Sequence, residues 1–501
     1  MIKPWFTFLA GVTCFFQLPA QSLAPPDTLE QARILAYSGR FQDASQLLAV
    51  YCRTGTDVYC LQLQAQVQYW MQDLRGARQL YQQALAAFPE ALPLQLDYAR
   101  FLFETGKLEQ AAVQLRQHVQ RDSLGAEAQQ MLATIDYYRG RNAAAEDRLE
   151  RLLAQYPDNP AALELLHELR RNTAPYLRLH SQLTGDDQPL QALALSLAGG
   201  VYRSWYFHPA LSLDTRRFAT GQDPASSWHL ALGNQWQLSR FGLGLSATGG
   251  LFRGGDEAIS PTGRVQLSQK ILPQAQLELH AERLPYQYTL ASAQTSFLHR
   301  HYRAALVIDQ ADSWMGQAAY ERQAFDDGNQ VNTTYFWLLA PLLRRAPFLL
   351  RAGYSYSYAD SRRSNFGALE TIEDILASGS PDEPIAGDYG LYFTPLRQIN
   401  HLLLLSVQVQ PGKYWQLAAR TSICLRAAAD NPSLYLDQDE QGRFFITTET
   451  FPLRYAPFEL EGSLGLSLSE QLQLNASYWF SQLFFFVRHQ VGLKFIYHFP
   501  P

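Results

Sequence analysis

The pattern of apolar and polar residues changes once along the chain, near residues 172–176. Before this point apolar residues recur every three or four positions, Ala, Leu and Gln dominate, and Gly is scarce, which predicts amphipathic helices. After it, apolar and polar residues alternate with a period of two, which predicts β-strands. The sequence therefore predicts a chain of the α + β class with two domains, a helical one over 21–174 and a strand-built one over 175–501.

Alternation is clearest near the C-terminus, where Val491, Leu493 and Phe495 alternate with Gly492 and Lys494. Segments of ten or so alternating residues, ending in an aromatic-rich strand, are typical of transmembrane barrels. The pattern predicts an antiparallel transmembrane β-barrel of about sixteen strands. These strands are expected at residues 176–184, 191–202, 207–219, 227–238, 241–252, 263–272, 275–286, 298–309, 313–325, 330–343, 347–360, 397–410, 414–428, 455–468, 471–481 and 486–499.

The predicted connections between these strands sort by length. Even-numbered connections such as 239–240, 273–274 and 469–470 are tight, whereas odd-numbered ones such as 361–396 and 429–454 are long. Outer-membrane barrels have short periplasmic turns and long outer loops, and a soluble β-domain has no reason to sort its loops in this way. We therefore expect an outer-membrane barrel whose first strand rises from the periplasm, where the helical domain lies.

A short string recurs in the helical half at Gly39, Gln72, Gly106 and Gly140, at intervals of 33, 34 and 34 residues. In this string Gly closes the turn between two helices and Ala lets them approach closely. Its turn residues are Gly39, Ala44, Ala77, Gly106, Ala111, Gly140 and Ala145. The pattern resembles the tetratricopeptide repeat over residues 27–172, with about four repeats. This resemblance implies an α-solenoid whose groove binds a protein or peptide, and a simple spacer is the alternative.

Residues 1–20 have the composition of an export signal, with Lys3, an apolar run over 5–16 and small residues up to Ala20. Disulfides persist in exported proteins. Cys52 and Cys60 lie eight residues apart. They are therefore expected either to form a bridge or to be buried thiols in a helix interface. Cys424 is expected to stay unpaired.

Composition excludes several classes of function. The net charge of -5 and the charged fraction of 17% give no basic field for nucleic acid. The aromatic fraction of 13% suits membrane-interface belts, and the mean hydropathy of -0.21 argues against a bundle of transmembrane helices. No catalytic motif or cofactor-binding loop is recognisable, so an enzyme is not expected. His299 and His301 share a strand face without a third ligand, so we expect no metal site.

Alternation also predicts which side chains line the lumen of such a barrel. The candidates are Glu278, His280, Glu282, Arg420, Arg426, Glu459, Glu461, Arg488 and Lys494. Both charge signs occur, which suits a hydrated polymer or polar solute and gives no single-sign filter. The alternative is that these groups pair with one another and select nothing.

The longest predicted connection ends with Tyr392, Phe393, Thr394 and Pro395. This string resembles the Tyr-Phe/Tyr-Ser-Pro stretch that opens a strand in the outer-membrane exporters of cellulose, poly-N-acetylglucosamine and Pel polysaccharide, with Thr394 where Ser is usual. Those exporters share the order of a repeat domain before a barrel. The resemblance implies a channel that passes an exopolysaccharide from the periplasm to the cell surface, with repeats that dock periplasmic partners or polymer.

The same order of domains also resembles the YaiO-like outer-membrane family. That resemblance implies a second possibility, a non-conducting anchor whose repeats recruit a periplasmic partner. Two features depart from the exporters. Four repeats are few, and Pro500 and Pro501 follow the last aromatic residue, Phe499, where the barrel signal normally ends on its aromatic.

Overall fold

A computed structural model describes residues 28–52, 57–187, 190–204, 206–219, 224–238, 241–255, 258–272, 274–309, 313–378, 384–412, 414–483 and 486–500. The predicted export signal, residues 1–20, lies outside the described residues. The chain divides into two compact units, the first ending at Leu166 and the second beginning at His167.

The first unit is built from helices that pack in consecutive antiparallel pairs, α1 with α2, α3 with α4, α5 with α6 and α7 with α8. Their bounds are α1 Thr28–Tyr37, α2 Phe41–Tyr51, α3 Val58–Trp70, α4 Leu74–Ala87, α5 Leu92–Glu104, α6 Leu108–Arg121, α7 Ala126–Tyr138 and α8 Asn142–Gln155. A further helix, α9 Pro160–Thr173, contains the boundary between the two units. The repeat residues Ala44, Ala77, Ala111 and Ala145 are fully buried, which permits close helix contact. In the described part of the chain, no helix is both long and apolar enough to span a membrane.

Left-handed backbone conformations mark the turns of the repeats. Gly39, Gly106 and Gly140 have φ angles of 79°, 76° and 68°, and Gln72 has 66° at the corresponding position. The amide of Arg40 donates to the Leu35 carbonyl at 2.9 Å, which closes the end of α1 in a Schellman-type turn. Three repeats therefore place glycine where the backbone favours it, and the second does not.

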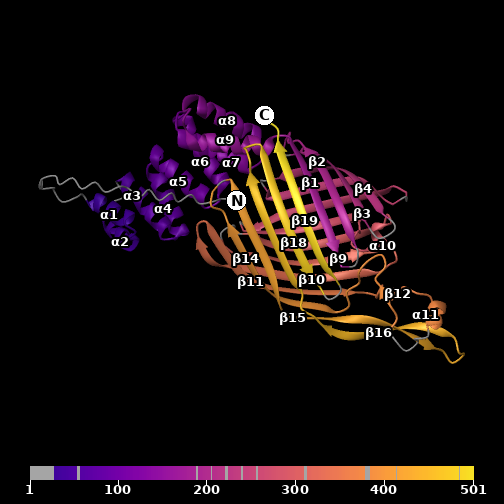
Figure 1. The fold of residues 1–501 in the computed structure, drawn as a ribbon. Helices are drawn as coiled ribbons and strands as arrows, with labels where there is room; N and C mark the ends of the chain where they lie inside the picture. The colour runs from indigo at the N-terminus through magenta and orange to yellow at the C-terminus, as the bar shows by residue number, and fades with distance from the viewer. Residues whose placement is uncertain are drawn as a thin grey trace. The chain divides into compact units, whose positions relative to one another are not determined.

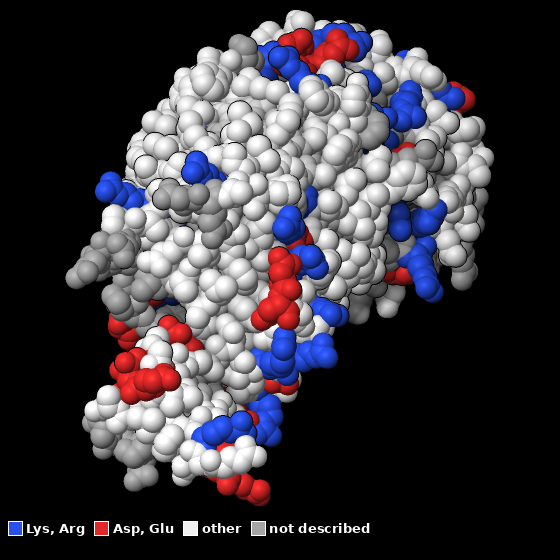
Figure 2. Space-filling view, turned by 90° about the vertical axis from the view of Figure 1, so that its right-hand side faces the viewer, with Lys and Arg blue, Asp and Glu red and all other residues white. Residues whose placement is uncertain are grey.

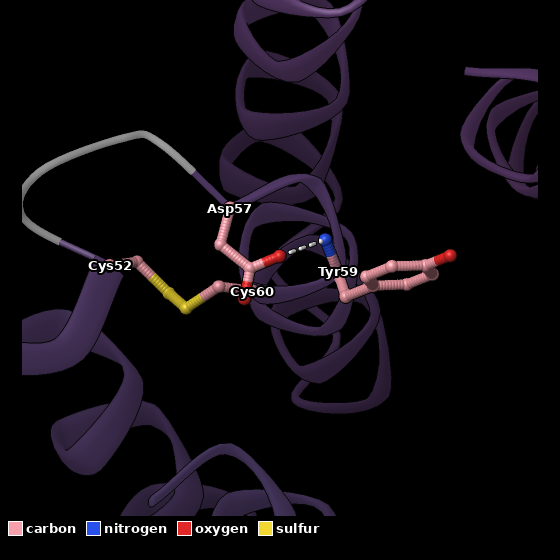
Figure 3. The surroundings of a disulfide bond; sticks show 4 residues. All are labelled: Cys52, Asp57, Tyr59 and Cys60. Carbon is pink, nitrogen blue, oxygen red and sulfur yellow. Dashed lines mark hydrogen bonds between the residues drawn. A yellow bond between two sulfur atoms is a disulfide. The ribbon is translucent and has the colours of Figure 1, made fainter.

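A disulfide joins Cys52 at the end of α2 to Cys60 in α3, with a Cα–Cα distance of 5.8 Å (Figure 3). Asp57 caps α3 and accepts a hydrogen bond from the Tyr59 amide at 2.9 Å. The bridge thus ties the first helical pair to the second. Cys424 is a free thiol.

The second unit is a closed antiparallel β-barrel (Figure 1). Its strands are β1 Tyr176–Asp186, β2 Gln191–Gly200, β3 Pro209–Ala219, β4 Ala225–Leu238, β5 Leu243–Gly254, β6 Ser260–Leu272, β7 Ala275–Pro285, β8 Leu298–Asp309, β9 Met315–Ala324, β10 Gln330–Arg345, β11 Phe348–Ser361, β14 Gln398–Val409, β15 Trp415–Gln438, β17 Phe458–Ser467, β18 Leu472–Gln482 and β19 Val487–His498. They follow one another in chain order, and β1 pairs with β19 to close a wall of 16 strands, as the alternation predicts.

One predicted loop contains regular structure. The first part of β15 pairs with β17 in the wall, whereas its second part pairs with β16, Phe444–Arg454. This hairpin extends beyond the wall, beside the short helix α11, Ile372–Ser378 (Figure 1). The short strands β12, Gly367–Ala368, and β13, Gly387–Asp388, pair within the preceding connection. The long connection predicted over 429–454 thus contains a hairpin, because its Thr- and Phe-rich segment favours a strand.

The barrel is apolar outside and polar inside. The outward leucines of β1 and β2 are 38–58% exposed, and the same row of each strand carries large apolar side chains around most of the wall. Figure 2 shows one face of the molecule, on which charged side chains gather in a few patches between broad uncharged areas. An apolar outer belt of this extent fits lipid and not water.

Candidate functional site

The lumen of the barrel is the candidate site. Two cavities of about 700 Å³ and 630 Å³ lie inside the wall and share the β1 residues His180 and Gln182. They are lined by residues of β1–β9, β17–β19 and the connection between β7 and β8, and most of these residues carry polar or charged side chains. A third cavity of about 180 Å³ is lined by residues of β10, β11, β14, β15, β17 and β18. The space inside the barrel is therefore bounded by hydrogen-bonding groups.

The structure places most of the predicted lumen residues on this inner face. Glu278, His280 and Glu282 lie on β7, Arg420 on β15, Glu459 and Glu461 on β17, and Arg488 and Lys494 on β19. Arg420 pairs with Glu461 across neighbouring strands at 2.6 Å, and Arg488 pairs with Asp186 at 2.8 Å. These groups neutralise one another where they meet.

The placement of Arg426 differs from its prediction. The register between β14 and β15 shifts between His401 and Leu402, so that Leu425 is an extra residue in β15. Leu402 lines the lumen, whereas His401, which is opposite Arg426, packs on the outward face with its ring 5.1 Å from that of Tyr356. Arg426 therefore lies on the outward face, because a β-bulge reverses the alternation.

A band of ion pairs crosses the inner face of four adjacent strands. It consists of Arg264 on β6, Glu278 and Glu282 on β7, His301 and Arg303 on β8, and Glu321 on β9. The His301 ring lies 3.0 Å from Glu282 and 3.4 Å from Glu321. Arg303 lies 3.2 Å from Glu321 and 3.5 Å from Glu278. Because each charge faces an opposite one on the next strand, the band presents little net charge to the lumen.

A loop between β7 and β8, residues 286–297, folds into the barrel, and we call it the strap. The Gln287 amide donates to Ser227 of β4 at 2.8 Å, in a buried contact. The guanidinium of Arg488 on β19 donates to the Tyr288 carbonyl at 3.3 Å. Since β1–β6 separate β19 from β7 in the wall, the strap spans a large part of the lumen.

The strap is fixed at both ends and along its middle. Its short helix α10, Leu290–Ala293, begins with a capping box between Thr289 and Ser292. Ala293 is fully buried against Phe218 of β3. The Ser296 hydroxyl accepts from the Gly254 amide at 2.8 Å. The strap is therefore a packed part of the barrel interior.

The predicted loop motif meets the strap. The Phe393 amide donates to the Tyr286 hydroxyl at 3.2 Å, and the Thr289 hydroxyl donates to the Leu391 carbonyl at 3.0 Å. Thr394 is fully buried, and its hydroxyl accepts a hydrogen bond from the backbone N–H of Asn365 at 2.9 Å. The Pro395 carbonyl accepts from the Ser361 hydroxyl at 2.7 Å. The longest connection thus packs against the strap through its Tyr-Phe-Thr-Pro string.

Tyr392 is the centre of this packing. Its ring stacks on Phe325 with a centroid distance of 3.6 Å, and its hydroxyl donates to Asp327 and accepts from Asn329 at 3.1 Å. Burial, together with the Asp327 carboxylate, raises the pKa of Tyr392 to about 12. Burial also raises the pKa of Tyr286 to about 12. Both phenols therefore stay neutral in this loop cluster.

Three lumen residues that the sequence analysis did not name pair with charged residues on the neighbouring strands. Arg264, Arg303 and Glu321 follow the same alternation as the predicted set, so that signal could have found them. His299 and His301 have ring centroids 6.2 Å apart. Within the described ranges, no group of three or more His, Cys, Asp or Glu side chains could hold a metal ion. No local signal indicated that the strap folds inward.

Residues 71–135 match the family model of the tetratricopeptide repeat. The chain thus combines a tetratricopeptide-repeat domain with a closed 16-stranded antiparallel barrel. No curated protein matches the sequence significantly.

Solved structures resemble separate parts of the chain. One described as "Bacterial polysaccharide outer membrane secretin" has a TM-score of 0.46 and 10% identity, over 65% of this chain and 99% of that one. MamA AMB-1 has a TM-score of 0.26 and 16% identity, over 29% of this chain and 80% of that one. Pseudomonas aeruginosa pilF has a TM-score of 0.27 and 18% identity, over 29% of this chain and 67% of that one.

Proposed function

We propose that this protein is an outer-membrane channel that passes a hydrophilic polymer, an exopolysaccharide, from the periplasm to the cell surface. The observation that supports this proposal is the cross-section of the barrel. Its outer face is apolar, and polar groups line inner cavities of about 700 Å³ and 630 Å³, which are large enough to hold water. A polymer of hydroxyl groups cannot cross hydrocarbon without losing its hydrogen bonds to water. A lumen of this kind replaces those bonds along the path.

The strap would act as the constriction of this channel. It is held by hydrogen bonds along its length and by packing in two buried clusters, one at Ala293 and one at Tyr286, rather than by a covalent link. Contacts of this kind open at a cost of a few kcal/mol, which a polymer under pressure from its synthase can supply. The repeat domain would lie in the periplasm and dock a partner protein or the polymer itself, because stacked repeats offer a continuous binding groove.

A second function is favoured by the strap itself. A loop that spans the lumen also suits a barrel that conducts nothing and serves only as a membrane anchor for the repeats. In that case the polar lining would merely satisfy its own ion pairs, as the band from Arg264 to Glu321 does.

Single-channel conductance of the full-length protein in a planar bilayer separates the two functions. We would compare wild type with a variant whose residues 287–296 are replaced by a short Gly-Ser linker. The matched control shortens the β15–β16 hairpin, which lies outside the wall. We expect a nanosiemens-scale current that appears or grows only when the strap is removed. Folded protein that is silent in all three forms would refute the channel and leave the anchor.

A further inference from the structure

Two basic residues lie side by side on the inner face at the end of the barrel where the chain enters it. Arg178 is on β1 and Lys494 on β19, and these strands pair with each other. Lys494 is directly opposite His180. His180 follows Arg178 by two residues on β1, so both of their side chains and that of Lys494 lie on the same face. Diagonal neighbours of this kind lie about 7–8 Å apart. Both side chains are partly exposed.

Neither cation has a counter-charge nearby. The inner-face neighbours on the adjoining strands are uncharged, namely Ser196 and Ala198 on β2, Ser212 on β3, Asn475 and Gln473 on β18, and Gly465 and Ser467 on β17. The carboxylate on these strands is Asp214 of β3, which lies opposite Ser196. It faces His229, with its carboxylate 3.7 Å from that ring. Among the described residues, neither Arg178 nor Lys494 forms an ion pair.

The guanidinium of Arg178 has unused hydrogen-bonding capacity. It lies 5.4 Å from the centre of the Tyr176 ring, and its Nε is buried without a hydrogen-bond partner in the described part of the chain. Many other lumen charges lie in pairs of opposite sign, such as Arg420 with Glu461 and Arg303 with Glu321. Arg178 and Lys494 therefore form a pair of neighbouring positive charges that no ion pair among the described residues neutralises.

We infer that Arg178 and Lys494 form a binding site for the oxyanion groups of an anionic polymer, at the end of the lumen opposite the strap. This inference rests on the proposed function and narrows its substrate class from hydrophilic to negatively charged. Two neighbouring cations repel each other, and an oxyanion between them removes that repulsion. The flat Arg fork binds a carboxylate or phosphate through two N–H groups, and Lys adds a mobile point charge.

The site can be tested by binding, independently of conduction. Oligogalacturonate, which carries one carboxylate per sugar, would be titrated into the full-length protein in detergent and followed by calorimetry. A cello-oligosaccharide of equal length is the neutral comparison. We expect oligogalacturonate to bind more tightly, and Arg178→Gln and Lys494→Gln each to weaken it about tenfold, since each removes a charge-assisted contact. Inorganic phosphate as competitor shows whether phosphate is accepted as well as carboxylate.

Arg217→Gln is the matched control, because it removes the same charge from the outward face of β3, where Arg217 is opposite Leu193. It should leave binding unchanged, and heat-modifiable gel mobility checks that every variant is folded. Equal binding of the neutral oligomer, no binding of either oligomer, or variants that bind like wild type would overturn the site. If wild type binds oligogalacturonate and the variants do not, but no form of the barrel conducts, the site is supported and the channel is refuted. If the barrel conducts but does not bind oligogalacturonate, the channel is supported and the site is refuted.

Discussion

Replacing Tyr392 by phenylalanine should loosen the longest connection of the barrel without weakening the wall. Tyr392 is 2% exposed, and its ring contacts Phe325, which the substitution preserves. The change removes only the hydroxyl, and with it the hydrogen bonds to Asp327 and from Asn329. The effect should therefore appear as local opening of residues 362–397.

The size of the effect follows from what each partner does afterwards. Asp327 is exposed and regains water, so losing it as an acceptor is inexpensive. Asn329 is 3% exposed, and its amide keeps one hydrogen bond, to the Arg363 carbonyl at 3.0 Å. The two losses together come to about 1.5 kcal/mol, or about a tenfold rise in the population of the open loop. Tyr392→Ala also removes the ring and should cost about 3–5 kcal/mol.

Amide hydrogen exchange followed by mass spectrometry measures this opening directly. Peptides from 362–397 should exchange about tenfold faster in Tyr392→Phe, while peptides from β14 and β15 keep the wild-type rate. Tyr302→Phe is the control, because Tyr302 is 46% exposed on the outward face. An unchanged loop, or faster exchange spread evenly over the wall strands, would refute the reasoning.

The anchoring should also depend on pH in a defined direction. The pKa of Tyr392 is raised from its ordinary value near 10 to about 12, because burial and Asp327 disfavour the phenolate. A raised pKa means that the folded loop favours the protonated form. Its contribution is complete below pH 10 and is lost as the pH rises from 10 to 12. An ultraviolet difference titration of wild type against Tyr392→Phe should show a tyrosinate signal with its midpoint near pH 12.

Three further predictions concern backbone, crosslink and register. Gln72→Gly should stabilise the repeat domain by about 0.5–1 kcal/mol in chemical unfolding and Gly106→Ala should destabilise it by about 1 kcal/mol, because both positions have positive φ; equal effects of the same sign would contradict this. Replacing Cys52 and Cys60 by serine should lower the stability of this domain by about 2–3 kcal/mol relative to oxidised wild type in the same measurement, and reduced wild type should unfold like the variant. A nitroxide at Arg426 should be relaxed by oxygen dissolved in lipid more than by a water-soluble nickel chelate, and the opposite result would place this residue in the lumen.

The sequence predicted the elements of the fold because their signals are local. The alternation of side chains along a strand depends on successive residues, so it located the wall strands. It also assigned a face to each candidate lumen residue, and the bulge at Leu425 reversed that assignment for Arg426. The repeat interval likewise located the helical turns at Gly39, Gly106 and Gly140, where positive φ favours glycine. Spacing also brought Cys52 and Cys60 within consideration as a pair, although it left the thiol alternative open.

Only the tertiary structure decided what the lumen contains. The strap contacts Arg488 and Ser227, which are distant in sequence, and no residue pattern in 286–297 predicts these contacts. Whether a lumen charge is neutralised depends equally on the strand beside it, which is why Glu282 is paired and Lys494 is not. A single extra residue in β15 likewise moved Arg426 to the outer face. Periodicity fixes the face of a residue relative to its chain neighbours, whereas charge balance and loop placement arise from contacts across the barrel, which only the closed fold brings together.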